Sequence, residues 1–85
     1  MTVEEAEQIL NDSEYIYIRS DCIYSGLSVL KEYFIGEKVY YSFEHDQIWV
    51  GARDFDEYVE VMSADDVLYM GRCGWFEDED SWSHH

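Results

Sequence analysis

The chain combines a large excess of acidic residues with many aromatic ones, and this combination limits what it can fold into. Its 85 residues include 20 Asp and Glu against 5 Lys and Arg, which gives a formal net charge of −15. A chain of this charge without aromatic residues would stay disordered, because it could not bury enough apolar surface to offset the entropy lost on ordering. Eight tyrosines, four phenylalanines and three tryptophans supply that surface. We therefore expect a folded domain with a very acidic surface.

The length is that of one small domain, residues 1–85, with residues 84–85 as a tail or the remnant of an expression tag. No apolar run approaches the roughly 20 residues that cross a bilayer, and the first residues are acidic where a signal peptide has basic ones. We expect a cytoplasmic protein that does not bind membranes. Cys22 and Cys73 lack the spacing of a metal or redox site, so we expect reduced, partly buried thiols rather than a disulfide.

Hydrophobic periodicity and capping residues predict three helices. The first follows Thr2, whose spacing from Glu5 matches a capping box, and glycines should end the other two. The segment 54–62 fits both a helix and a strand, and a short helix or turn is preferred. The predicted helices cover residues 3–11, residues 25–35 and the segment from Ser63 to Gly74.

Runs of β-branched and aromatic residues predict strands. Two of these runs are separated only by Glu44-His45-Asp46, which indicates an antiparallel hairpin. A second hairpin should carry Glu77-Asp78-Glu79-Asp80 at a solvent-exposed tip. The predicted strands cover residues 15–19, 38–43, 47–51, 75–76 and 81–83. The expected fold class is α+β, with two antiparallel hairpins or one small antiparallel sheet packed against two to three short helices.

The sequence contains no pattern of a common catalytic site, so we expect neither an enzyme nor a cofactor. It has no phosphate-binding glycine loop, nucleophile elbow or HExxH motif. Asp54/Asp56 and Asp78/Asp80 match the first two ligands of a calcium loop, but the glycine and the bidentate glutamate of that loop are missing. His45 at a hairpin tip is expected to be a solvated turn residue. No metal site is therefore predicted, although the terminal histidine pair is chemically able to bind a metal ion.

The charge density of the chain is close to that of DNA. A compact domain of this length has a diameter of about 30 Å, and about 30 Å of B-DNA carries roughly 18 negative charges. Carboxylates can replace phosphates because arginine pairs with both through the same bidentate geometry and lysine attracts both as a point charge. Such a surface should bind a basic nucleic-acid-binding protein or nuclease complex, and nucleic acid itself should repel it.

Most of the acidic residues lie in the second half of the chain, where we predict the binding surface. Residues 39–85 hold 12 acids and 2 bases, whereas residues 1–38 hold 8 acids and 3 bases. Tyrosine and tryptophan desolvate well at the centre of an interface and should act as anchors. The predicted acidic surface comprises Glu44, Asp46, Asp54, Asp56, Glu57, Glu60, Asp65, Asp66, Glu77, Asp78, Glu79 and Asp80. The predicted aromatic anchors are Tyr40, Tyr41, Trp49, Tyr58 and Tyr69.

The block from Ser63-Ala64-Asp65-Asp66-Val67 through Gly74-Trp75-Phe76 to Asp80-Ser81-Trp82, in a short and very acidic chain, resembles small orphan proteins of phages and mobile elements. In size and charge the chain is similar to DNA-mimicking anti-CRISPR and anti-restriction inhibitors. The resemblance implies an inhibitor in the host cytoplasm that blocks the DNA- or RNA-binding groove of a host nuclease or CRISPR effector. It assigns no role to any single residue.

Two other functions remain open. An immunity protein that neutralises a nuclease toxin would present acid to a basic active site in the same way. A regulatory or structural module would instead bind an ordinary partner, or itself, through exposed aromatic residues, with the acids as a solvated rim. The sequence identifies neither the target nor the oligomeric state.

Overall fold

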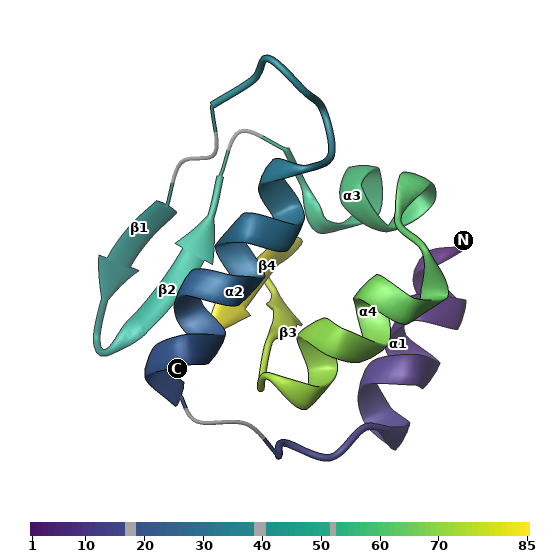
Figure 1. Ribbon diagram of the computed structural model, residues 1–85, viewed down its shortest axis with the longest axis horizontal. Helices are drawn as coiled ribbons and strands as arrows, with labels where there is room; N and C mark the ends of the chain where they lie inside the picture. Colours follow the sequence, from purple (N-terminus) through teal and green to yellow (C-terminus); the bar gives the residue numbers. More distant parts are fainter. Residues whose placement is uncertain (17–18, 39–40, 52) are drawn as a thin grey trace.

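The computed structural model of the chain describes residues 1–16, 19–38, 41–51 and 53–85. These residues form four helices and one antiparallel sheet of four strands, which confirms the α+β class (Figure 1). In chain order the elements are α1 (Val3–Asp12), α2 (Arg19–Lys31), β1 (Tyr41–Glu44), β2 (Gln47–Val50), α3 (Phe55–Val61), α4 (Ala64–Arg72), β3 (Phe76–Asp78) and β4 (Ser81–His84).

Both predicted hairpins are present, and they join into one sheet. The strand order is β1-β2-β4-β3, so that β2 and β4 pair antiparallel in the middle and β1 and β3 are the edges. In the central pair, Ile48 lies opposite His84 and Trp49 opposite Ser83. His84 is therefore not part of a loose tail: it ends β4, and only 3% of its surface is exposed.

Both hairpins turn through two non-glycine residues with positive φ. The values are 52° and 61° for His45 and Asp46, and 51° and 57° for Glu79 and Asp80. Two-residue hairpin turns with positive φ at both positions follow the right-handed twist of the strands, but they favour Asn-Gly or Asp-Gly. A side chain in this conformation costs on the order of 1 kcal/mol, so both turns hold some backbone strain.

The helices at the start and in the second half of the chain follow the sequence prediction. At α1, Thr2 Oγ1 accepts from the Glu5 N–H at 3.1 Å, and the Glu5 carboxylate accepts from the Thr2 N–H at 3.0 Å, which completes the capping box. Ser63 caps α4 in the same way, accepting from the Asp66 N–H at 3.1 Å. The ambiguous segment 54–62 contains a helix, α3.

The segment before α2 differs from the prediction. The predicted strand 15–19 is wrong: residues 15 and 16 have no regular structure, Arg19 begins α2, and residues 17–18 lie outside the described part. Residue 16 lies at the end of α4, where the Ile16 N–H donates to the Arg72 carbonyl at 2.9 Å, and residues 15–16 do not pair with the sheet. The second helix was also misplaced, because α2 begins six residues before the predicted 25–35 and ends at Lys31.

A close approach of Trp75 to α2 holds the helical layer on the sheet. Trp75 is buried, and its indole Nε1 donates to the Cys22 carbonyl at 2.9 Å. A Cβ at Gly26 would lie 2.1 Å from this nitrogen, so only glycine fits there. The same core holds Phe55 edge-to-face on Trp82, with ring centroids 4.8 Å apart. On the other side, α1 lies alongside α4 (Figure 1).

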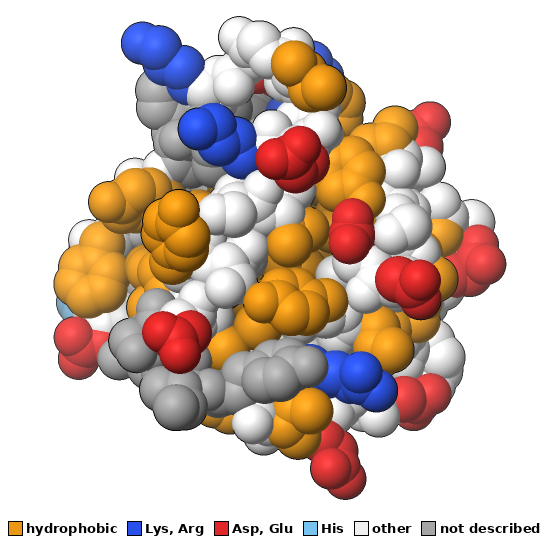
Figure 2. Space-filling model, viewed as in Figure 1, with side chains coloured by type: hydrophobic (Ala, Val, Ile, Leu, Met, Phe, Trp, Pro, Cys, Tyr) orange, Lys and Arg blue, Asp and Glu red, His pale blue; other side chains and the backbone are white. Residues whose placement is uncertain are grey.

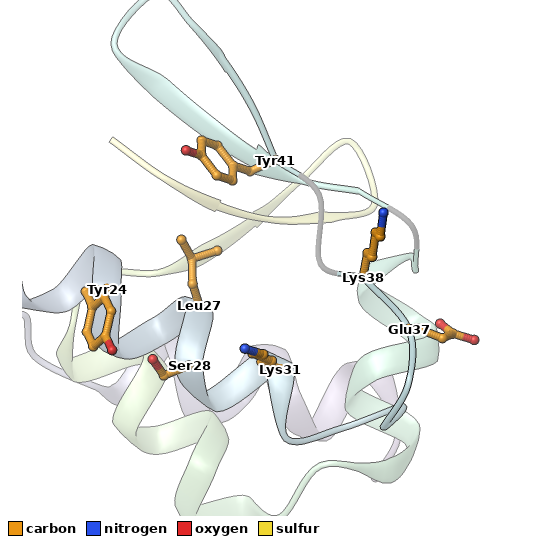
Figure 3. Close-up of a pocket in the computed structure, with 7 residues that line it drawn as sticks. All are labelled: Tyr24, Leu27, Ser28, Lys31, Glu37, Lys38 and Tyr41. Carbon is orange, nitrogen blue, oxygen red and sulfur yellow. The ribbon is translucent and has the colours of Figure 1, made fainter.

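α2 and β1 diverge and leave an open groove of about 570 Å³ (Figure 3). We call this the α2–β1 groove; its lining residues are Tyr24, Leu27, Ser28, Lys31, Glu37, Lys38 and Tyr41. In Figure 2 hydrophobic side chains gather on the left of the molecule, over β1, β2 and α2, whereas most of the acids on this face lie along its right and lower margins. Within the described residues, no helix is long and apolar enough to cross a membrane.

We expect Gly26→Ala to destabilise the protein by about 2 kcal/mol. Alanine should gain about 1 kcal/mol of helix propensity, but overpacking against Trp75 costs about 1–3 kcal/mol and the hydrogen bond to Cys22 is lost as well. Chemical denaturation followed by tryptophan fluorescence measures the change. Ser28→Ala, in the same helix but partly exposed, is the control and should stay within about 0.5 kcal/mol of wild type. A Gly26→Ala protein as stable as wild type would contradict the close approach.

We expect His45→Asn combined with Asp46→Gly to stabilise the protein by about 1 kcal/mol, because the new residues adopt positive φ without strain. For a domain of this size, this corresponds to a rise in melting temperature of about 4–8 °C. Thermal unfolding followed by circular dichroism measures it. Asp65→Gly makes the same type of change in the first turn of α4 and should instead lower the melting temperature. An unchanged or lower melting temperature of the turn variant would show that the turn is unstrained.

Candidate functional site

Three exposed carboxylates lie together at the start of α3. One oxygen from each of Asp54, Asp56 and Asp80 lies within 4.8 Å of the others. We call these three residues the acidic cluster. Asp54 is the N-cap of α3, Asp56 lies in its first turn, and Asp80 lies in the β3–β4 turn. The Phe55 N–H joins this turn to the helix by donating to the Asp80 carbonyl at 2.7 Å. Residues more than 20 positions apart in sequence thus form one negatively charged surface.

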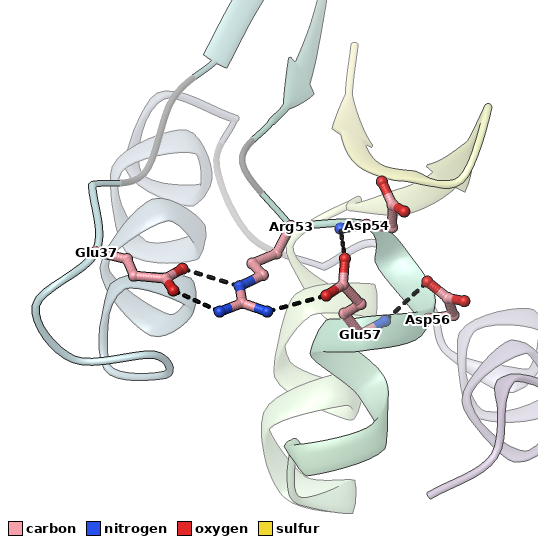
Figure 4. Close-up of polar contacts among 5 residues, drawn as sticks. All are labelled: Glu37, Arg53, Asp54, Asp56 and Glu57. Carbon is pink, nitrogen blue, oxygen red and sulfur yellow. Dashed lines mark hydrogen bonds and ion pairs between the residues drawn. The ribbon is translucent and has the colours of Figure 1, made fainter.

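Local hydrogen bonds hold the start of α3 in place (Figure 4). The Glu57 carboxylate accepts from the Asp54 N–H at 3.2 Å, and the Asp56 carboxylate accepts from the Glu57 N–H at 2.9 Å. Negative side chains are favourable here, because the first turn of a helix carries a partial positive charge. The backbone that carries the acidic cluster is therefore ordered without a bound partner.

The nearest arginine pairs with other carboxylates. Arg53 donates to Glu57 at 3.0 Å and makes two hydrogen bonds to Glu37, while its guanidinium lies 4.3 Å from the centre of the Phe34 ring (Figure 4). These bonds raise the pKa of Arg53. The Asp54 N–H and Arg53 lower the pKa of Glu57. Across the described ranges, no ion pair neutralises Asp54, Asp56 or Asp80.

Asp54 has a raised pKa in these surroundings. Desolvation raises the pKa of Asp54, and the negative charges of Asp80, Glu57 and Asp56 raise it further. A cationic partner would relieve this repulsion. Three carboxylates at this spacing can accept hydrogen bonds from arginine or lysine, and they can also ligate a divalent cation whose shell is completed by water.

The other nine predicted acids lie in different surroundings. Asp78 accepts from Gln47 at 2.9 Å and from Trp49 at 3.1 Å, and Asp66 accepts from the Tyr33 hydroxyl. At the tip of the second hairpin only Glu79 and Asp80 are exposed, because Glu77 and Asp78 are half-buried. The remaining members are Glu57, which pairs with Arg53, Glu44 and Asp46 at the β1–β2 hairpin, Glu60 on α3, and Asp65 on α4. The structure therefore brings three of the twelve acids together at contact distance.

One predicted aromatic anchor is wrong. Tyr58 lies on the inner side of α3, where it is 2% exposed and packs edge-to-face on Phe34, so that no partner can reach it. Trp49 and Tyr69 are half-buried. Tyr41 is 60% exposed and can serve as an anchor, whereas Tyr40 lies outside the described residues.

Among the described residues, three exposed aromatic side chains were missed by the sequence prediction: Tyr15, Tyr24 and Phe43. Tyr24 on α2 is 76% exposed and Phe43 on β1 is 60% exposed. Tyr24 directly follows Ile23, which belongs to the apolar stripe of the predicted helix, and this offset was a usable signal. Phe43 alternates with Ser42 and Glu44 in its strand, which normally indicates a buried side chain. It is exposed because no helix or strand of the described part of the chain covers β1.

The two cysteines are free and buried, as expected. Burial, together with a hydrogen bond that the Cys22 thiol donates to the neighbouring Cys73, raises the pKa of Cys22 to about 12. Because the thiolate is the reactive form, we expect the native protein at pH 8 to react with a thiol reagent such as Ellman's reagent far more slowly than the urea-unfolded protein. Rapid labelling of both thiols in the native protein would contradict this burial, and Cys22→Ala and Cys73→Ala would show which thiol reacts.

Comparisons of the chain with protein-family models, with curated proteins and with solved structures found no match. The acidic cluster is therefore interpreted from its own charge and geometry.

Proposed function

We propose that this protein is an inhibitor of a host defence protein, of the anti-CRISPR or anti-restriction type. It binds the basic groove that normally holds DNA or RNA and presents carboxylates in place of phosphates. The observation that carries the proposal is the acidic cluster, in which Asp54, Asp56 and Asp80 are exposed, lie within 4.8 Å of one another and have no ion-pair partner among the described residues.

The local charge density of the acidic cluster supports the mimicry. One strand of B-DNA carries a phosphate charge about every 3.4 Å of helix axis, and the three carboxylate oxygens lie within 4.8 Å of one another. An arginine or lysine side chain that binds a DNA strand would therefore find closely spaced anionic acceptors on the acidic cluster as well. Since carboxylates and phosphates accept from arginine through the same geometry, one basic surface can bind either.

The scaffold also favours tight binding. The hydrogen bonds around α3 and the β3–β4 turn fix the backbone that carries the three carboxylates, and the Glu57 N–H also holds the Asp56 carboxylate, so that little backbone ordering entropy is lost on docking. The net charge of −15 on a molecule of 27 × 26 × 21 Å creates a field that attracts a basic partner from a distance. Binding should accordingly weaken as salt screens this field.

A displacement assay tests the proposal. Labelled duplex DNA is bound to each member of a panel of purified restriction enzymes and CRISPR effector complexes, and release of the DNA by this protein is measured. We expect the variant Asp54→Asn, Asp56→Asn and Asp80→Asn to need at least about tenfold more protein for half-release, because each lost carboxylate leaves a basic group of the partner unpaired. The corresponding lysine variant should be weaker still, because it adds repulsion.

A matched control removes the same number of charges elsewhere. Glu4→Gln, Glu7→Gln and Glu14→Gln change three exposed acids of the N-terminal region and should leave release nearly unchanged. Equal loss in both triple variants would show that only total charge matters. Failure to release DNA from any member of the panel, even at low salt, would contradict the proposed function.

A further inference from the structure

The edge strand β1 has an unpaired outer side. In the sheet order β1-β2-β4-β3, β2 is its only strand partner among the described residues, and all four residues of β1 are exposed. An edge strand offers a row of free backbone N–H and C=O groups to which a further strand can add. Within the described residues, no helix or strand covers this edge.

The apolar face of the sheet continues onto β1 and is left open there. Tyr41 lies opposite Val50 and Phe43 opposite Ile48, so that each shares a face with a buried residue of β2. Tyr41 and Phe43 are nevertheless each 60% exposed. Tyr24 lies across the α2–β1 groove and adds a third exposed ring. An apolar surface of this kind favours contact with another sheet edge that has the same composition.

Opposite charges lie at the two ends of β1. Lys31 and Lys38 line the end of the α2–β1 groove that precedes the strand, and neither forms an ion pair within the described ranges (Figure 3). Glu37 points away from the groove and pairs with Arg53. Glu44 and Asp46 lie at the other end, at the β1–β2 turn. An antiparallel copy of the same strand would therefore place its acidic end beside these lysines.

We propose that two copies of this chain form a dimer by antiparallel pairing of their β1 strands. A two-fold axis passes near Ser42, so that Tyr41 of each copy lies beside Phe43 of the other. The end of the α2–β1 groove that holds Lys31 and Lys38 then lies beside the acidic end of the other copy's β1, which carries Glu44 and Asp46. The two sheets become one sheet of eight strands, and the apolar face of each β1 is continued by the other.

This dimer is independent of the proposed inhibition. The acidic cluster lies at α3 and at the turn that joins β4 to β3, the opposite edge of the sheet, so both copies keep it exposed. Repulsion between two chains of net charge −15 opposes association, and it is strongest at low salt. At physiological salt the screening length is about 8 Å, so the overall repulsion is reduced while ion pairs at contact persist. We therefore expect dimerisation to be weak at low salt and stronger at physiological salt.

Sedimentation equilibrium from micromolar to millimolar protein at physiological salt tests the dimer. The wild-type protein should approach twice the monomer mass at the highest concentrations. Lys38→Glu and Glu44→Lys should each weaken association by about tenfold or more, because each places like charges together across the interface. The double variant with both changes should recover wild-type association, since the charges are exchanged but remain complementary. The two residues lie at opposite ends of β1 in one copy, so this recovery can come only from contact between copies.

Two further variants keep the result interpretable. Arg72→Glu with Glu4→Lys exchanges exposed charges on α4 and α1, and it should leave association unchanged. Phe43→Ser should weaken association while the melting temperature stays near that of wild type, because Phe43 is already exposed. A monomer at every concentration, a dimer unaffected by the single reversals, or a double variant that fails to recover would each overturn the proposal. None of these outcomes bears on release of DNA by the acidic cluster, whose assay stands separately.

Discussion

The contact between Trp75 and α2 determines how this helix packs on the sheet. The indole lies against the helix backbone at Gly26 and donates to the Cys22 carbonyl, so α2 is held at a fixed position over the sheet. A small core gains most from large rings, because each buries much apolar area at a low cost in side-chain entropy. Burial of Trp75 and Trp82 helps to offset the stability that repulsion among the surface carboxylates removes.

The placement of the acids limits the cost of their charge. Several lie in the first turns of α1, α3 and α4, where the helix dipole and free N–H groups favour a carboxylate. Asp66 and Asp78 accept hydrogen bonds from side chains and are thereby held in place. The acidic cluster is different. Desolvation raises the pKa of Asp54, and the negative charges of Asp80 and Asp56 raise it further. Repulsion that the fold does not relieve is free energy that a basic partner can recover on binding.

The sequence predicted the elements whose signals are local. Caps at Thr2 and Ser63 and the strand runs around the two turns identified α1, α4 and both hairpins correctly. The start of α2 was missed because residues 15–19 have strand propensity, whereas the Ile16 backbone bonds to the end of α4 and not to a strand. The acidic cluster was predicted as part of a longer set, since no sequence spacing reveals that Asp80 returns to the start of α3. The burial of Tyr58 also depends on a tertiary contact, because this side chain packs on Phe34, which is distant in sequence.

The β3–β4 turn shows that charge and stability compete in this fold. Glu79 and Asp80 adopt positive φ, a conformation in which Asn-Gly would be less strained. Such a turn would lack both carboxylates, including the one that Asp80 contributes to the acidic cluster. Strained residues persist where the surrounding structure holds them, and here the Phe55 N–H and the Glu77 carboxylate bond to the backbone of Asp80. His45 and Asp46 share this conformation, so positive φ belongs to both hairpin turns, and at the β3–β4 turn it accompanies the placement of the Asp80 carboxylate beside α3.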